Sequence, residues 1–311
     1  MNMKLISVVT ACYNEEKNIA ETYRRVKEVF GELDTYSYEH IFIDNASQDK
    51  TVEILKDIAK KDKNVKIIVN SRNFGHIRSP FYGLMQAKGD AVISIVADLQ
   101  DPPQMIKDFI NKWEDGYKIV IGIKKYSREP RLMFAARQLF YRIIGALAEI
   151  DLIPNFTGFG LYDKKVIEIL RSIDDPYPYF RGLISDIGFD IARIEYIQPA
   201  RKQGATKNTL YTLYDMAMLG ITNHSKLPLR LATLFGFICS IGFSLTGIVY
   251  LLYKLIFWQR FSIGIAPIAI GFFFFASVQL FFIGILGEYI GSIHTQVLKR
   301  PLVIEKERIN F

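Results

Sequence analysis

A carboxylate and an amide stand two residues apart at the end of a short apolar segment. Asp98 and Gln100 follow Ala91–Ala97, whose Val, Ile and Ala residues are typical of a buried strand. Side chains two apart in an extended segment point to the same side, so their oxygen atoms can act together. Such oxygen ligands suit Mg²⁺ or Mn²⁺, which usually takes one or two carboxylates plus substrate phosphates. Taken alone, the pair is better explained as a solvated strand end, and only its context can favour a metal site.

A second carboxylate, Asp44, closes the apolar segment Ile41–Asp44. An acid in that position can accept hydrogen bonds from the N–H of a base or from a ribose hydroxyl. Ser47 and Asp49 follow at the predicted start of a helix, where hydroxyl and carboxylate side chains commonly cap the first turn. We therefore expect Ser47 and Asp49 to cap this helix and Asp44 to contact a ligand.

A basic loop, Arg201–Lys207, surrounds Gly204 after the late strand-like segment Ile191–Ile197. Arg201 and Lys207 around a flexible glycine can close over a diphosphate, since guanidinium and ammonium groups bind phosphate oxygens strongly. The same loop also fits a basic segment that binds lipid headgroups beside a membrane. The two interpretations are compatible.

The elements that position these residues alternate between short apolar strands and amphipathic helices. Such alternation predicts βαβ units, an α/β fold and a mostly parallel sheet, which binds ligands beyond the carboxyl ends of its strands. The predicted strands are Leu5–Thr10, Ile41–Asp44, Val65–Val69, Ala91–Ala97, Lys118–Ile123 and Ile191–Ile197, and the predicted helices are Ile19–Phe30, Thr51–Lys61 and Ser79–Ala87.

The last quarter of the chain differs in character from the rest. Leu231–Tyr253 and Ser262–Gly287 contain no charged residue, and each exceeds the roughly 20 residues that cross a bilayer. Leu210–Leu219, just before them, has helical spacing and predicts a helix at the membrane interface, or alternatively an amphipathic helix packed on the soluble part. We expect a soluble domain at residues 1–208, an interfacial segment at 209–230 and two transmembrane helices with a tail at 231–311.

The charge distribution predicts an anionic partner and an orientation in the membrane. The formal net charge is +7, from 39 Lys and Arg against 32 Asp and Glu, which suits phosphates or a membrane surface. The basic residues are scattered and no nucleic-acid-binding motif is visible, so nucleic acid is not expected. Lys226, Arg230, Lys299 and Arg300 flank the apolar pair. The positive-inside bias therefore places the soluble domain and both termini in the cytoplasm, at the inner membrane of a bacterial cell.

Several motifs together resemble the polyprenyl-phosphate glycosyltransferases of glycosyltransferase family two, which include dolichyl-phosphate mannose synthase and the bacterial undecaprenyl-phosphate glucosyltransferases. The resemblance covers nearly the whole chain, and the tail with Gly287–Gly291 and Arg300-Pro301 is similar to the bacterial members. The motifs occur in the family's order: Tyr13-Asn14-Glu15-Glu16, Asp44 with Ser47 and Asp49, Asn70–His76, Ala97–Pro103 and Arg201–Lys207.

The resemblance implies a GT-A fold and transfer of a sugar, with inversion, from a nucleotide sugar to polyprenyl (undecaprenyl) phosphate. Tyr13, Asn14, Glu15 and Asp44 would surround the nucleotide, and Asp98 and Gln100 would hold Mg²⁺ or Mn²⁺. Arg201 and Lys207 would close over the phosphates. Arg131 and Arg137 would meet the acceptor phosphate. UDP-glucose is the donor that the resemblance favours, while GDP-mannose, UDP-N-acetylglucosamine and UDP-galactose stay open.

Three positions depart from the family pattern. Val96 and Asn45 stand where acids are usual, and Gly158 replaces an acid often assigned as catalytic. A phosphate monoester acceptor is already anionic near neutral pH, because its second pKa is about 6, and needs no general base. We therefore interpret the chain as an active subgroup. The alternatives are a glycosyltransferase with another acceptor and a non-catalytic protein that binds nucleotide sugars. The spans contain Gly236, Gly242 and Gly247 and could pack with a second copy.

Overall fold

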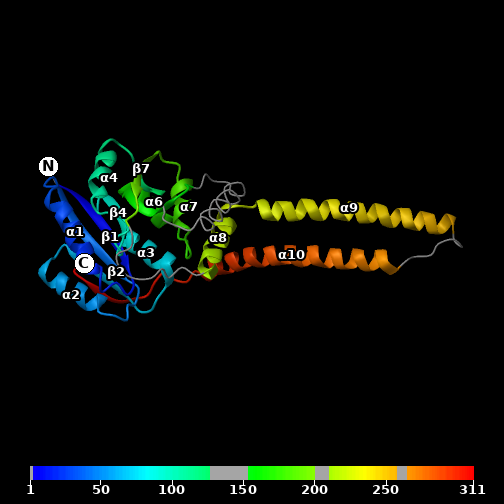
Figure 1. Cartoon of the computed structure of the whole chain (residues 1–311), viewed down its shortest axis with the longest axis horizontal. Helices are drawn as coiled ribbons and strands as arrows, with labels where there is room; N and C mark the ends of the chain where they lie inside the picture. The colour runs from blue at the N-terminus through cyan, green and yellow to red at the C-terminus, as the bar shows by residue number, and fades with distance from the viewer. Residues whose placement is uncertain (1–2, 127–152, 200–209, 258–264) are drawn as a thin grey trace.

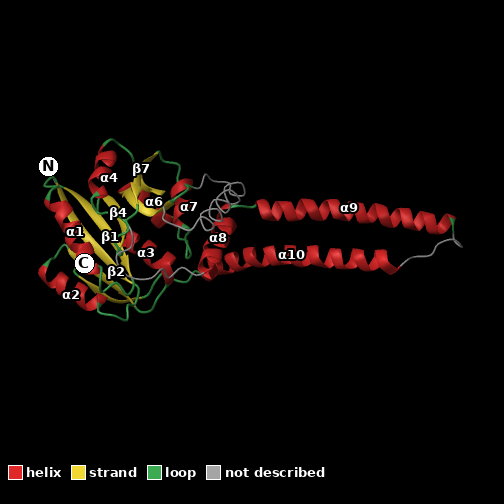
Figure 2. Cartoon of the chain, viewed as in Figure 1, coloured by secondary structure: helices red, strands yellow, loops and turns green. Residues whose placement is uncertain are grey.

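The computed structural model describes residues 3–126, 153–199, 210–257 and 265–311. The described strands form one sheet, in the order β7-β5-β6-β4-β1-β2-β3-β8 (Figure 2). The central strands β4, β1, β2 and β3 are mutually parallel, whereas β6 and β8 run antiparallel to their neighbours. The strands are β1 (Lys4–Cys12), β2 (Tyr36–Asp44), β3 (Val65–Asn70), β4 (Ala91–Val96), β5 (Ile119–Tyr126), β6 (Phe156–Asp163), β7 (Ile191–Ile197) and β8 (Glu305–Ile309).

Helices cover both faces of this sheet (Figure 1). Alternate strand residues point to opposite faces. Thus Ile6 and Val8 of β1 pack in the core that includes α1 and α4, and Val9 packs in the core that includes α3, α6 and α7. The helices are α1 (Ile19–Gly31), α2 (Thr51–Lys61), α3 (Gly75–Gln86), α4 (Met105–Glu114), α6 (Lys164–Ser172) and α7 (Phe180–Asp186). The predicted α/β class with a mostly parallel sheet is confirmed, and the carboxyl ends of β1, β2 and β4 share one edge.

Helix α3 and strand β6 show where the structure departs from the predicted elements. Helix α3 begins at Gly75 rather than Ser79, although Pro80 lies within it. The carbonyl oxygen of the Asn73 side chain accepts a hydrogen bond from the Gly75 amide at 2.8 Å, which satisfies a donor at the helix start. Strand β6 contains Gly158 and Gly160, whose lack of side chains hid it from a search for alternating apolar residues.

The C-terminal residues return to the sheet as an edge strand. β8 pairs antiparallel with β3, so the predicted tail is an element of the fold. Tyr82 of α3 donates a hydrogen bond to Glu305 at 2.8 Å, and Lys56 of α2 lies 2.5 Å from Glu307. The side-chain amide of Asn310 donates to the carbonyl oxygens of Ala59 and Val65, each at 2.9 Å. These contacts fix the chain that leaves the last helix onto the sheet and its helices.

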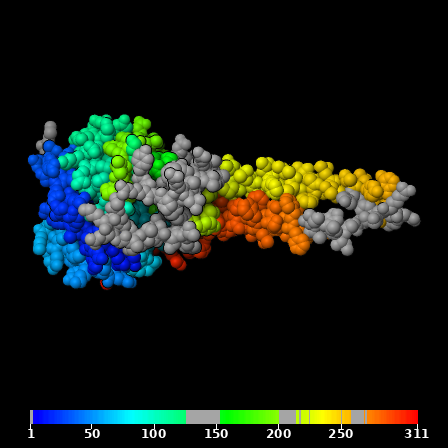
Figure 3. Space-filling model, in the orientation of Figure 1, coloured from blue at the N-terminus to red at the C-terminus, as the bar shows by residue number. Residues whose placement is uncertain are grey.

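Three further helices lie beyond the sheet: α8 (Leu210–His224), α9 (Leu227–Ile256) and α10 (Ile265–Leu298). Helices α9 and α10 lie side by side and project from the domain as a narrow hairpin (Figures 1 and 3). Their large apolar side chains face outward, for example Phe237 at 69% and Phe273 at 71% exposure. Both helices are long and apolar enough to cross a membrane. α10 runs eleven residues past the predicted end at Gly287, and Tyr214 of α8 donates to Glu288 at 2.8 Å.

Candidate active site

Two loops at the carboxyl ends of β1 and β2 hold each other through backbone-to-side-chain hydrogen bonds. The Asn14 amide donates to Ser47 Oγ and the Gln48 amide donates to Asn14 Oδ1, both at 2.8 Å. Asn14 has φ of 54°, a left-handed conformation that asparagine tolerates better than most residues. Ser47 thus accepts across the loops rather than capping α2, which corrects the expectation for this residue. Asp49 is not the N-cap of α2 either, because Lys50 holds that position; Asp49 lies one residue earlier and accepts from the Thr51 amide at 3.0 Å, which supports the helix start.

Asp44 is fully buried at the end of β2. Its carboxylate accepts hydrogen bonds from the Ser47 amide, at 2.9 Å, and from the Ser47 hydroxyl. Burial raises the pKa of Asp44, while the bonds from Ser47 lower it. Asp44 therefore shapes the loop that pairs with Asn14, and any contact between this carboxylate and a ligand would use a group already fixed by the fold.

Glu15 and Glu16 add further hydrogen bonds between the loops that follow β1 and β2. The Glu15 amide donates to Thr51 Oγ1 at 2.8 Å, and the Glu15 carboxylate accepts from the side-chain amide of Asn18 at 2.7 Å. Glu16 adds two more bonds between the loops: its amide donates to the Asp49 carboxylate at 3.1 Å, and its carboxylate accepts from the Lys50 amide at 3.1 Å. The loop after β1 is preorganised, which lowers the entropy that ligand binding would cost.

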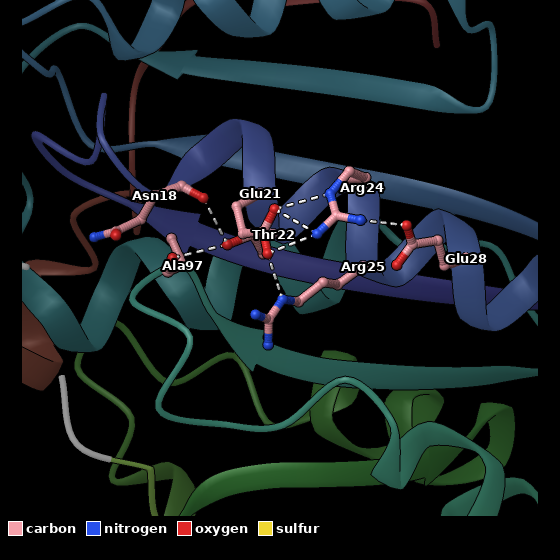
Figure 4. A network of polar contacts seen from close by, with 7 residues as sticks. All are labelled: Asn18, Glu21, Thr22, Arg24, Arg25, Glu28 and Ala97. Atoms are coloured by element: carbon pink, nitrogen blue, oxygen red, sulfur yellow. Dashed lines mark hydrogen bonds and ion pairs between the residues drawn. The ribbon is translucent and has the colours of Figure 1, made fainter. Parts of the chain in front are cut away.

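Asp98 lies in the turn after β4 and is only 7% exposed. Its Oδ1 accepts from the Gln100 amide at 3.0 Å, and Leu99 between them has φ of 62°. Thr22 of α1 donates its hydroxyl to the Ala97 carbonyl at 2.9 Å (Figure 4). Helix α1 therefore anchors the backbone immediately before Asp98 and fixes where this carboxylate stands.

Asp101 follows the same strand as Asp98, but its carboxylate has a structural role. It is 3% exposed and accepts from Tyr196 of β7 at 3.0 Å and from the Val96 amide at 3.4 Å. Burial raises the pKa of Asp101 to about 6. These bonds direct the carboxylate toward Tyr196 and the Val96 backbone, so it is not favoured as a metal ligand.

Asn45, where the family pattern has an acid, uses both ends of its amide. Its Nδ2 donates to Asn73 Oδ1 at 2.8 Å and to the Gly75 carbonyl at 3.0 Å. Its Oδ1 accepts from the Phe74 amide at 2.8 Å. A carboxylate could accept but could not donate, so the amide is what holds the loop that starts α3.

A cavity of about 300 Å³ opens between β4, β6 and the helices α3 and α7. Val96 lines it, 43% exposed, together with Gly158 at φ +99°, a conformation that disfavours any side chain. A Cβ on Gly160 would overlap the Val120 carbonyl oxygen. Val96 and Gly158, two of the three positions that depart from the family pattern, therefore line the same cavity. The backbone conformation and close packing of β6 favour glycine at positions 158 and 160.

His76 and Arg181 line the same cavity. Burial lowers the pKa of His76, the charge of Arg181 lowers it further, and Asp215 of α8 raises it. Neither residue was predicted as a site residue. The Asn70–His76 motif pointed to His76 without giving it a role, and Arg181 stands in no motif that sequence analysis singled out.

The structure brings together most of the residues predicted for the donor and the metal. Arg131, Arg137, Arg201 and Lys207 lie outside the described residues. Tyr13, Asn14, Glu15, Asp44, Asp98 and Gln100 all follow β1, β2 or β4 at the shared edge of the sheet.

The residues at this edge fit a divalent metal held mainly by its substrate. The described part of the chain contains no group of three or more His, Cys, Asp or Glu that could hold a metal ion by themselves. Asp98, with Gln100 beside it, offers one carboxylate and one amide oxygen. Mg²⁺ commonly binds through one or two carboxylates while substrate phosphates and water supply the remaining ligands.

Comparison with known proteins identifies the family. The sequence model described as Glycosyl transferase family 2 matches residues 7–170. The chain is 38% identical to the Uncharacterized glycosyltransferase YkcC of Bacillus subtilis, over 96% of this chain and 92% of that protein. It is 34% identical to the Bactoprenol glucosyl transferase of Shigella phage SfII, over 97% of each.

Among solved structures, glucosyl-3-phosphoglycerate synthase from Mycobacterium tuberculosis, crystallised with Mn²⁺, UDP and phosphoglyceric acid, has a TM-score of 0.46 and 20% identity, over 70% of this chain and 76% of that one. The family model covers more than half of the chain, and the relatives match it almost from end to end. The chain therefore belongs to glycosyl transferase family 2.

Proposed function

We propose that this protein transfers a hexose, with glucose from UDP-glucose the best candidate, to the phosphate of a polyprenyl lipid. The observation that carries the proposal is the end-to-end similarity to relatives named bactoprenol glucosyl transferases, at 34% identity over 97% of both chains. That similarity includes the apolar hairpin α9–α10 as well as the soluble domain. A lipid substrate gives a physical reason for joining a sugar-transfer domain to such a hairpin.

The donor would bind at the shared edge of β1, β2 and β4. Tyr13, Asn14, Glu15 and Asp44 would surround the nucleotide, in loops that the hydrogen bonds to Ser47 and Thr51 already hold in place. Asp98 and Gln100 would hold Mg²⁺ or Mn²⁺ at the diphosphate. The metal ion would neutralise the charge that develops on the leaving diphosphate. Arg201 and Lys207 are proposed to close over the same phosphates.

The acceptor chemistry is consistent with a site without a catalytic base. A phosphate monoester oxygen would attack C1 of the sugar from the side opposite the leaving group. The C1–O bond would break with its electron pair going to the nucleoside diphosphate, so configuration inverts and no proton has to be removed. Gly158, where an acid is often found, is compatible with this reaction, because the attacking oxygen is already ionised near neutral pH. Arg131 and Arg137 are proposed to meet the acceptor phosphate.

The proposed setting is the cytoplasmic face of a bacterial inner membrane. Helices α9 and α10 would be the two spans, after an interfacial segment at residues 209–230 that includes α8. Lys226, Arg230, Lys299 and Arg300 lie at the domain end of the hairpin, which favours a cytoplasmic domain by the positive-inside rule. Packing of the hairpin with a second copy is compatible with this arrangement.

The test is transfer of radiolabelled sugar from a panel of nucleotide sugars to undecaprenyl phosphate by the purified full chain in detergent. Assays would run with Mg²⁺, with Mn²⁺ and with a chelator. We expect a lipid-extractable product from one donor that requires the metal, and its loss by at least about a hundredfold in Asp98→Ala. Full activity of Asp98→Ala would contradict the assigned donor site. Donor binding without a lipid product would favour another acceptor or a non-catalytic role.

A further inference from the structure

The cavity between β4, β6, α3 and α7 is lined by both apolar and polar residues. Its apolar lining includes the strand residues Val9, Ile95 and Val96. Its polar lining includes Arg181 of α7, His76 of α3 and Thr157 of β6. At about 300 Å³, it lies at the small end of the range of roughly 300–1,000 Å³ for ligand pockets.

The polar residues that line the cavity suit an anion better than a neutral sugar. None of the described residues that line the cavity is Asp or Glu, whereas sugar hydroxyls commonly need carboxylate or amide oxygens as acceptors. Arg181 carries a permanent positive charge. Burial is the main cause of the lowered pKa of His76; Asp215 of α8 opposes it, and the charge of Arg181 adds to it. A neutral imidazole can still donate one hydrogen bond to an oxyanion.

The position of the cavity fits an acceptor that comes from the membrane side. One wall is Val96, two residues before Asp98 at the proposed diphosphate site. Another lining residue, Tyr179, contacts the helix that leads to the hairpin, since a Cβ on Gly220 of α8 would lie 3.5 Å from its ring. Asp215 of α8 also acts on His76. The cavity thus lies between the donor edge and α8.

We propose that this cavity binds the phosphate of the lipid acceptor, with Arg181 as its cation and His76 as a hydrogen-bond donor. The inference rests on the proposed function and deepens it, since it assigns the acceptor phosphate to described residues for which sequence analysis gave no role. Arg181 and His76 hold the anion in line with C1 of the sugar. The apolar lining residues exclude water from the reacting atoms, which strengthens the charge interaction.

The experiment compares Arg181→Gln, Arg181→Lys and His76→Ala with the unmodified full chain in detergent. Arg193→Gln is the matched control, because Arg193 is exposed on β7, the strand at the far edge of the sheet. Initial rates are measured against undecaprenyl phosphate at saturating donor. Calorimetry then measures binding of UDP and of UDP-glucose, and binding of farnesyl monophosphate in the presence of UDP. UDP affinity also reports whether each variant is folded.

For Arg181→Gln we expect kcat/KM for the lipid and affinity for farnesyl monophosphate to fall about 10- to 100-fold, since a charge-assisted hydrogen bond to the phosphate is lost. Arg181→Lys should recover part of the loss, and His76→Ala should lose about 3- to 10-fold, as for one weaker bond. UDP binding should stay within about twofold in every variant and in the control.

The outcomes separate this inference from the proposed function. If the unmodified chain transfers no sugar to lipid but binds farnesyl monophosphate through Arg181, the reaction assigned above is wrong and the anion site stands. If lipid transfer proceeds and Arg181→Gln changes neither lipid kinetics nor farnesyl monophosphate binding, the cavity is not the phosphate site. An equal loss of UDP-glucose affinity and lipid affinity would assign the cavity to the donor sugar and overturn the inference.

Discussion

At the scale of single residues, Asn45 shows that a residue that departs from the family pattern can hold the fold together. Its amide donates to Asn73 and to the Gly75 carbonyl, and it accepts from Phe74. A carboxylate there would face two acceptors. We expect Asn45→Asp to lower the free energy of unfolding by about 1–3 kcal/mol, because buried donors and acceptors lose their partners.

Urea unfolding of the full chain, followed by tryptophan fluorescence, measures this effect. Asn111→Asp on α4 introduces the same chemical change at an exposed position and should leave stability within about 0.5 kcal/mol. Equal stability of Asn45→Asp and the unmodified chain would show that the loop before α3 does not depend on this amide.

A second residue-scale prediction concerns His40, which is fully buried in β2. Its Nε2 lies 2.8 Å from Thr10 Oγ1, and burial lowers its pKa to about 3. The folded pKa is below the unfolded value of 6.5, so the unfolded chain binds the proton first as pH falls. Stability from this group is present above pH ~6.5 and is lost between pH ~6.5 and pH ~3.

Lowering the pH from 7 to 5 should therefore reduce the free energy of unfolding by about 2 kcal/mol, because His40 is protonated in the unfolded chain but not in the folded one. Urea unfolding at the two pH values would measure the loss in the unmodified chain and in His40→Gln, which does not titrate in this range. We expect the variant to be less stable at pH 7 and to lose about 2 kcal/mol less on acidification. The same acid sensitivity in both proteins would assign the loss to other groups.

At the scale of elements, the sequence predicted those parts whose pattern follows from burial. β7 has the predicted bounds, and α2 spans Thr51–Lys61 as expected. β6 was missed because Gly158 and Gly160 break its apolar alternation. β8 was missed because Glu305–Ile309 is mostly charged, which is typical of an edge strand that avoids further pairing. Arg181 was missed because its role depends on a cavity that only the packing of α7 against β6 creates.

Strand β8 makes its own prediction, because it ties the end of α10 to β3 and to Tyr82 of α3. Deleting residues 305–311 would remove this strand and leave the domain joined to α10 by fewer contacts, such as those from Gln296 to Asp175 and from the Ser71 amide to the Ile304 carbonyl, each at 2.8 Å. We expect lipid transfer to fall by about tenfold, since the domain would sample more orientations relative to the membrane and its effective concentration of acceptor would drop. UDP affinity should be unchanged if the donor loops stay folded.

The deletion is best compared with Lys306→Ala, which keeps the strand and removes one exposed side chain. Parallel assays of lipid transfer and UDP binding distinguish tethering from loss of fold. Wild-type transfer by the deleted chain would show that the remaining contacts orient the domain without β8. Loss of UDP binding as well would show that β8 is needed for the fold of the sheet.

At the scale of the whole molecule, the hairpin and the charges at its two ends define an orientation that can be measured. The domain end carries Lys226, Arg230, Lys299 and Arg300, whereas Lys254 is the basic residue in the last turn of α9. The positive-inside rule then predicts that the domain lies in the cytoplasm. An 88% exposed side chain on the domain, that of Asp174, and the 43% exposed Phe257 at the far end of α9 offer labelling positions on opposite sides.

In a background with both native cysteines replaced by alanine, Asp174→Cys and Phe257→Cys would be labelled with a membrane-impermeant maleimide. We expect Asp174→Cys to react only in inside-out vesicles and Phe257→Cys only in right-side-out vesicles. The reverse pattern would place the domain outside the cytoplasm, away from nucleotide sugars. It would contradict the proposed reaction at the cytoplasmic membrane face. Reaction of both positions from the same side would instead mean that the hairpin does not cross the bilayer. The acceptor phosphate would then have to reach the cavity beside Arg181 without a pair of spans to hold its lipid near α8.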